Sequence, residues 1–103
     1  MTEGTGSDAN PRDGDRVSYR LEVAPDGRVS NVSAWVAACA AGTAAATRLA
    51  TMAEGHSVEE IRTIGVAALS KVLDLNPDEE RCALTAIGAL RAALVDAQVK
   101  AAV

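Results

Sequence analysis

Large aromatic side chains are nearly missing from this 103-residue chain, which has no phenylalanine, one tryptophan and one tyrosine. Its interior must therefore be built from aliphatic residues and alanine, whose side chains pack closely but bury little area each. The length fits one domain, and a core of this kind is thin for it. A bound metal or a partner subunit would supplement such a core.

Clusters of basic residues are also missing. The 10 Lys and Arg residues are scattered among 14 Asp and Glu residues, for a formal charge of −4. Because nucleic-acid binding needs clustered basic side chains against phosphate, we expect no nucleic-acid partner. No uninterrupted apolar run reaches the roughly 18 residues of a membrane span, and the first residues do not resemble a signal peptide. We therefore expect a cytoplasmic protein that does not enter a membrane.

Cysteine is scarce as well: only Cys39 and Cys82 occur. Without a secretory signal, the reducing compartment favours two free thiols or two metal ligands over a disulfide. Taken alone, two cysteines in an alanine-rich chain are more often small buried residues than ligands.

Composition divides the chain near residue 12. The first residues are rich in Gly, Ser, Thr and acids, which predicts a flexible tail over residues 1–12 and one folded domain over residues 13–103. Val17, Tyr19 and Leu21 alternate with polar residues, the pattern of a half-buried strand. A turn over residues 24–28 and a second strand over residues 29–36 complete an antiparallel hairpin.

Helical patterns occupy the rest of the chain. One helix is expected from Thr43 to Gly55, and a capping box at Ser57 starts a short second helix. A third stretch follows over residues 67–73, and Asn76 caps the longest helix, which carries Cys82 after its first turn. The fold class is thus α+β, with a small hairpin-based antiparallel sheet packed against a layer of helices.

Both cysteines are expected near helix N-termini. The partial positive charge there stabilises a thiolate, the form that binds metal or accepts sulfur. Asp13 or Asp15, just before the first predicted strand, could supply a third anionic ligand. Thiolates with a carboxylate suit zinc or an iron–sulfur cluster better than magnesium.

Several segments carry a family resemblance. Asp13-Gly14-Asp15-Arg16-Val17 looks like a Cys-Gly-Asp-x-Val entry to a strand, and Asp26-Gly27-Arg28-Val29 looks like a Gly-Lys/Arg-Ile/Val hairpin. Ala38-Cys39-Ala40-Ala41 stands where Gly-Cys-x-x precedes a helix, and Arg81-Cys82-Ala83-Leu84 is similar to His/Arg-Cys-x-Leu. In this order the motifs resemble the NifU N-terminal, IscU and SufU family of iron–sulfur cluster assembly scaffolds, which implies a SufE/NifU-like fold.

The resemblance implies a site and a function. In that family three cysteines and an aspartate hold a nascent [2Fe–2S] cluster, or zinc in its place, after a cysteine desulfurase delivers sulfur. Here the matching residues are Asp15, Cys39 and Cys82, while Asp13 replaces the first cysteine. We therefore expect a non-enzymatic scaffold or carrier that binds iron, a cluster or zinc less tightly than a complete site and passes the cluster to recipient proteins.

Two other functions remain open. A persulfide sulfur-transfer protein would accept sulfur on Cys39 or Cys82 and need no metal. A degenerate family member would keep the fold and serve as a non-metal interaction subunit, in the form of a homodimer through its alanine-rich helices. The spatial prediction common to the metal-binding hypotheses is that Asp15, Cys39 and Cys82 converge.

Overall fold

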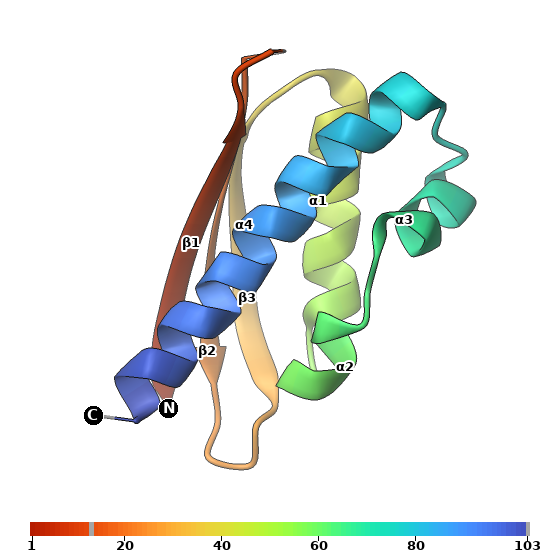
Figure 1. Cartoon of the computed structure of the whole chain (residues 1–103). Coiled ribbons are helices and arrows are strands. Elements are labelled where there is room, and N and C mark those ends of the chain that lie inside the picture. The colour runs from red at the N-terminus through yellow and green to blue at the C-terminus, as the bar shows by residue number, and fades with distance from the viewer. Residues whose placement is uncertain (13, 103) are drawn as a thin grey trace.

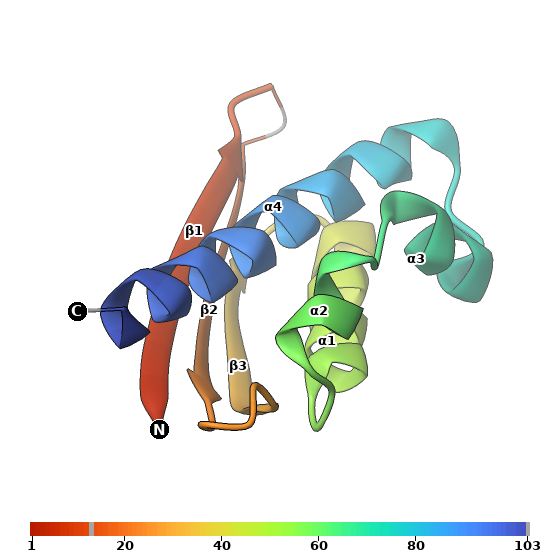
Figure 2. The same cartoon turned by 60° about the horizontal axis from the view of Figure 1, so that its bottom comes forward.

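The computed structural model describes residues 1–12 and 14–102. Its described part has a three-stranded antiparallel sheet in the order β1-β2-β3 and four helices that follow the strands along the chain. The elements are β1 (Thr2–Asn10), β2 (Asp15–Val23), β3 (Val29–Ala37), α1 (Ala40–Ala53), α2 (Val58–Arg62), α3 (Val66–Leu73) and α4 (Pro77–Ala101). All four helices lie on one side of the sheet (Figures 1 and 2), so the predicted α+β class is confirmed.

The predicted hairpin is formed by β2 and β3, which pair antiparallel from Arg16 opposite Ala37 to Val23 opposite Val29. The inward side chains of β2 are buried from Asp15 to Leu21 and Val23 is partly buried, while the intervening residues face outward. The turn between the strands contains Gly27 at φ 87°, a conformation that glycine adopts without steric cost. Period-two alternation therefore gave the inward face of β2 correctly.

The prediction of a flexible tail over residues 1–12 was wrong. Residues 2–10 form β1, which pairs with β2 from Thr2 opposite Val23 to Asn10 opposite Asp15. The glycines that suggested disorder have a packing role, because a Cβ at Gly4 or Gly6 would collide with the backbone of α4 at Ala93. Because glycine has no side chain, α4 lies directly on the backbone of β1.

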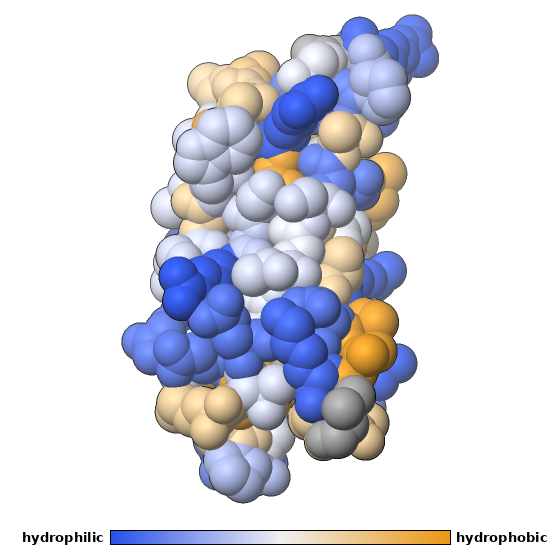
Figure 3. Space-filling view, turned by 90° about the vertical axis from the view of Figure 1, so that its left-hand side faces the viewer, coloured by the Kyte–Doolittle hydropathy of each residue, from blue (hydrophilic) through white to orange (hydrophobic). Residues whose placement is uncertain are grey.

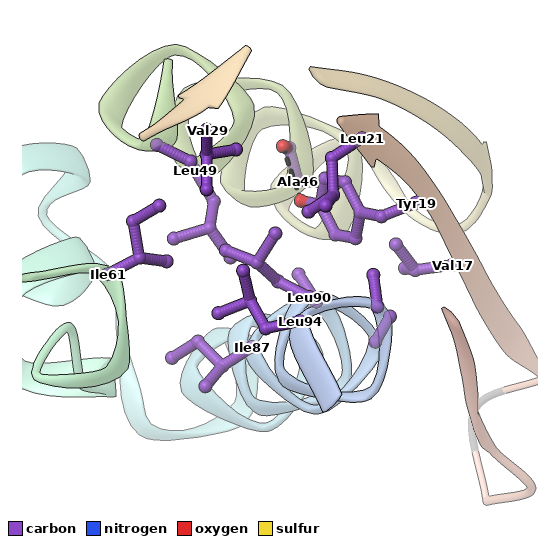
Figure 4. Packing of buried hydrophobic residues seen from close by; sticks show 14 of the residues in the cluster. Val17, Tyr19, Leu21, Val29, Ala46, Leu49, Ile61, Ile87, Leu90 and Leu94 are labelled. Atoms are coloured by element: carbon purple, nitrogen blue, oxygen red, sulfur yellow. Dashed lines mark hydrogen bonds between the residues drawn. The ribbon is translucent and has the colours of Figure 1, made fainter. Parts of the chain in front are cut away.

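The core lies between the sheet and two long helices. α4 packs across β1 and β2, and α1 packs against β3 and α4. Alanines on the inner face of α4 allow this close approach, and larger aliphatic side chains fill the centre (Figure 4). Tyr19 reaches across from β2, and its hydroxyl donates a 2.6 Å hydrogen bond to the carbonyl oxygen of Ala46.

Among the described residues, α4 alone is long and apolar enough to span a membrane by length and composition. Of its most apolar stretch, 56% is buried within the protein, as in the core helix of a water-soluble protein. The helix is therefore weak evidence for a membrane segment.

The outer face of the sheet is not covered by any described element. Small polar side chains line a shallow depression on it, beside Trp35, which is 61% exposed. Figure 3 views the molecule from this side and shows mostly pale and blue residues across the strands. This face differs sharply from the apolar one that the helices cover.

Candidate metal centre

Three elements bring Asp15, Cys39 and Cys82 to one end of the molecule. Asp15 is the first residue of β2, Cys39 directly precedes α1, and Cys82 follows the first turn of α4. The two sulfurs lie 3.5 Å apart, and ligand atoms of all three residues lie within 4.8 Å of one another. In Figure 1 the first turns of α1 and α4 meet at the end of the sheet where β2 begins. The structure thus brings together the three residues that the sequence singled out.

Cys39 is itself the N-cap of α1. Its backbone is extended, with φ −65° and ψ 170°, and its sulfur accepts a 3.4 Å hydrogen bond from the amide of Gly42. The helix begins at Ala40, three residues before the predicted Thr43, because a side-chain acceptor at the cap satisfies an otherwise free amide. The thiol of Cys39 therefore lies at the positive end of a helix and remains exposed.

Gly42 explains how the two helix starts come so close. A Cβ at this position would lie 2.9 Å from the Ala38 Cβ and 3.3 Å from the Cys82 Cβ, both tighter than ordinary contact. Glycine therefore allows the first turn of α1 to reach α4. Sequence reasoning missed this residue, and its only signal was a glycine inside the helix, three positions after the cysteine.

Cys82 is buried, with 6% of its surface exposed. Burial raises the pKa of its thiol to about 12, and hydrogen bonds to Asp15 and Cys39 contribute in the same direction. The expectation that a helix N-terminus would stabilise the thiolate is therefore wrong for Cys82, because desolvation and a neighbouring carboxylate outweigh the helix dipole. A bound cation would reverse that balance, since it attracts the thiolate.

Asp15 is the least satisfied polar group of the three. The residue is 4% exposed, and its Oδ2 atom is buried with no hydrogen-bond partner in the described part of the chain. An unsatisfied buried polar group costs about 1–3 kcal/mol, and more when it is charged. A carboxylate with one buried oxygen left without a partner, beside two thiols, is an arrangement that a metal ion would complete.

Comparison with known proteins agrees with this geometry. The sequence model of the family described as NifU-like N terminal domain matches residues 1–103, the whole chain. The chain belongs to the NifU-like N-terminal domain family. The iron–sulfur cluster assembly scaffold protein IscU of Rickettsia prowazekii (strain Madrid E) is 29% identical to this NifU-like domain over 97 residues, which cover 94% of the domain and 74% of the relative.

A second relative is the iron–sulfur cluster assembly enzyme IscU of Drosophila melanogaster. It is 27% identical over 100 residues, which cover 97% of this NifU-like domain and 65% of the relative. The chain thus spans about two thirds of the fly protein's length. One relative is named a scaffold and the other an enzyme, so the expectation that this domain is not an enzyme stays a prediction.

The donor atoms of the NifU-like domain fit a transition metal. Two thiolates at about 2.3 Å from a tetrahedral zinc lie roughly 3.8 Å apart, and the observed sulfur separation is 3.5 Å. Two sulfurs with one carboxylate match zinc or iron, whereas magnesium and calcium prefer oxygen alone. Around a tetrahedral metal these three residues would leave one position open.

The open side of the centre is a cavity of about 330 Å³ lined by the three residues together with Asn76, Asp78, Glu79 and Arg81. Arg81 stands directly before Cys82 and pairs with Asp78 at 3.0 Å, and its Nε atom is buried without a partner among the described residues. A positive side chain therefore borders an otherwise acidic cavity. Asp13, the further predicted ligand, lies outside the residues that the structure describes.

Proposed function

We propose that this NifU-like domain is an iron–sulfur cluster assembly scaffold or carrier. Its cargo would be iron or a nascent [2Fe–2S] cluster, with zinc as the other occupant. Membership of the family and the names of the two IscU relatives support this function. The observation that carries it is the convergence, from three separate elements, of two thiols and a buried carboxylate whose Oδ2 atom has no hydrogen-bond partner among the described residues.

Each residue would have a distinct role. Cys39 and Cys82 would be the sulfur ligands, and Asp15 would add an oxygen that is easier to displace than a thiolate. An open cavity over the centre allows cargo to enter and leave. Three donors and one open position favour transient holding over permanent storage, which suits a protein that receives sulfur from a cysteine desulfurase and delivers clusters to recipients. Asp13 is a further candidate ligand by its place in the motif, and we propose a cytoplasmic location.

Metal content tests this proposal directly. The protein would be purified without air, and iron, zinc and acid-labile sulfide would be measured per chain in the wild type, Cys39→Ala and Cys82→Ala. We expect one metal site per wild-type chain, lost in both variants because each removes a ligand. Ser33→Ala, on the outer face of the sheet, is the matched control and should keep its metal. Far-UV circular dichroism establishes that all variants are folded.

A second measurement on the same proteins, the persulfide content after incubation with a cysteine desulfurase and cysteine, separates the other functions. A wild type without metal that carries a desulfurase-dependent persulfide would replace the scaffold with a sulfur-transfer protein. Neither metal nor persulfide would point to an interaction subunit. Metal retained in both cysteine variants would show that the ligands lie elsewhere.

A further inference from the structure

The outer face of α4 carries an apolar ridge. At about 100° per residue, the side of the helix within an arc of about 80° holds Leu84, Gly88, Ala92, Val95 and Val99. The three largest of these are 53%, 56% and 59% exposed, and Figures 1 and 2 show no other element over this side of α4. Because soluble proteins seldom leave a contiguous apolar strip open to water, the α4 ridge indicates an interaction surface.

Charged side chains lie along both flanks of the ridge and turn away from it. On one flank, the guanidinium of Arg91 donates a 3.3 Å hydrogen bond to the carbonyl oxygen of Ile64. On the other flank, Asp96 accepts a 2.9 Å hydrogen bond from the Thr5 amide and pairs with Lys100 at 2.9 Å. The apolar side chains between the flanks therefore stay uncovered.

The flank that carries Asp96 holds a second acid. Asp8 of β1 is exposed, and its carboxylate lies against Gly88, where a side chain on that residue would collide with it. Its Oδ1 atom accepts a 2.8 Å hydrogen bond from the Ala9 amide. One flank of the ridge is thus basic at Arg91, and the other carries the carboxylates of Asp8 and Asp96.

We propose that the α4 ridge binds the same ridge of a second copy of this chain, with the two helices parallel about a two-fold axis. In a parallel two-fold pair each flank faces the opposite flank of the other helix, so that Arg91 of one copy faces Asp8 and Asp96 of the other. An antiparallel pair would set Arg91 against Arg91. Charge complementarity therefore selects both the partner and its orientation.

The spacing along α4 agrees with this arrangement. Parallel coiled coils form salt bridges between the g position of one helix and the e position of the other. With Arg91 at g and Asp96 at e, the seam positions a, d and a fall on Ala92, Val95 and Val99. Small and β-branched side chains at the seam allow two helices to approach closely.

The ridge is too small for a permanent dimer. From Leu84 to Val99 it is about 22 Å long, and a strip of helix this short offers much less than the roughly 800 Å² per partner of a standard interface. The dimer is therefore weak and forms reversibly as the concentration rises. Cys82 is buried on the inner side of α4, so pairing leaves the candidate metal centre open and does not depend on the scaffold function.

Sedimentation velocity of metal-free, reduced protein tests the pairing from low micromolar to near-millimolar concentration. The wild type should shift from monomer towards dimer over this range. Val95→Glu should raise the dissociation constant at least about tenfold, because pairing would bury an unpaired charge. Val72→Glu is the matched control, because Val72 is 48% exposed on α3, away from the ridge, and it should pair like the wild type.

Two further variants test the orientation. Arg91→Glu should weaken pairing several-fold, because it places an acid opposite Asp8 and Asp96. Val99→Cys, in a Cys39→Ala/Cys82→Ala background, should form a disulfide-linked dimer under mild oxidation, since parallel helices bring the two copies of this residue together. An antiparallel pair would hold these thiols at opposite ends of the ridge. Circular dichroism establishes that each variant is folded, and Val95→Ser replaces Val95→Glu if the acid disturbs the fold.

Four outcomes would overturn the proposal. A wild type that stays monomeric throughout would leave the ridge to a different partner, and equal pairing by Val95→Glu or by Arg91→Glu would place the interface elsewhere. Equal loss in Val72→Glu would do the same. Absence of a cross-link in the Val99→Cys protein while it still dimerises would exclude the parallel arrangement. Metal content is read separately, and Val95→Glu should bind as much metal as the wild type.

Discussion

The carboxylates at the two ends of α1 differ in their hydrogen bonding. At its start, Asp15 of β2 is buried beside Cys39, and one carboxylate oxygen has no partner among the described residues. At its end, Glu54 accepts hydrogen bonds from the amides of Asn31 at 2.7 Å and Val32 at 3.0 Å. Both carboxylate oxygens of Glu54 accept hydrogen bonds from the backbone of β3, whereas one oxygen of Asp15 has no partner among the described residues.

This difference indicates where the molecule is prepared for a ligand. A buried carboxylate oxygen without a partner destabilises the metal-free protein, and a cation bound by Asp15 and the two thiols would recover that free energy. A cation beside Glu54 would add little to the stability, because both of its oxygens already accept hydrogen bonds from amides of the edge strand β3. The comparison therefore predicts opposite responses to substitution at the two ends.

The largest expected effect is the stabilisation of the wild type by zinc. A ligand at 100 times its dissociation constant adds about 2.7 kcal/mol to the free energy of unfolding when it binds only the folded protein. Urea unfolding with and without zinc measures this gain. Cys82→Ser should lose it, because a serine hydroxyl is a poor zinc ligand. Asp26→Asn, at the turn beyond the other end of β2, should keep it; an equal gain in Cys82→Ser would place the metal elsewhere.

The next largest effect is expected from Asp15→Ala in metal-free protein. Removing a buried carboxylate whose Oδ2 atom is unsatisfied should raise the free energy of unfolding by about 1–2 kcal/mol, although the site loses a ligand. For a domain of this size, each 1 kcal/mol corresponds to roughly 4–8 °C in the melting temperature. Thermal unfolding in the presence of a chelator measures the shift.

The control for that substitution is Asp26→Ala. The Asp26 carboxylate is exposed and accepts a 3.0 Å hydrogen bond from the Arg28 amide, so its removal should destabilise the protein slightly. A loss of stability in Asp15→Ala would mean that its carboxylate is satisfied in solution, and the contrast between the two ends would disappear.

Much of the fold was accessible from the sequence, because its signals are local. Alternation along β2 predicted which side chains face inward, and the side-chain caps at Ser57 and Asn76 predicted the starts of α2 and α4, both of which form complete capping boxes. The motifs also pointed to Asp15, Cys39 and Cys82 together, although no spacing within the chain joins them.

The features that the sequence did not reveal depend on contacts between distant segments. Gly4 and Gly6 suggested disorder, because nothing near them in the chain shows that α4 lies against their backbone. The raised pKa of Cys82 follows from burial and from Asp15, which is 67 residues away in the numbering of the chain. Helix position alone therefore gave the wrong charge for that thiol.

Tyr19 provides an intermediate case on the same inward face of β2 as Asp15. Its buried hydroxyl is satisfied by Ala46, so Tyr19→Phe should lower the free energy of unfolding by about 1 kcal/mol, opposite in sign to Asp15→Ala. Burial also raises the pKa of Tyr19, so the folded protein keeps this proton to higher pH than the unfolded chain does. That contribution is complete below pH about 10 and is lost as the pH rises further.

The pH dependence is measured by urea unfolding between neutral and strongly alkaline pH. Because the pKa of Cys82 is also raised, Tyr19→Phe is compared with its parent in a Cys82→Ser background. The parent should lose stability more steeply than the phenylalanine variant above pH about 10. Parallel curves would show that Tyr19 titrates normally and is not sealed in the core.

The smallest effect is expected at Glu54, where water can replace a lost acceptor. Glu54→Ala removes the partner of two amides on the exposed edge of β3 and should lower the free energy of unfolding by about 0.5–1 kcal/mol. Glu54→Gln keeps one oxygen acceptor and should lose less. Amide hydrogen exchange at Asn31 and Val32 should accelerate in the alanine variant, which ties the loss to these bonds. If Glu54→Ala instead stabilised the protein, an unpaired carboxylate would no longer distinguish the metal centre from the rest of the fold, and the thiols alone would have to mark it.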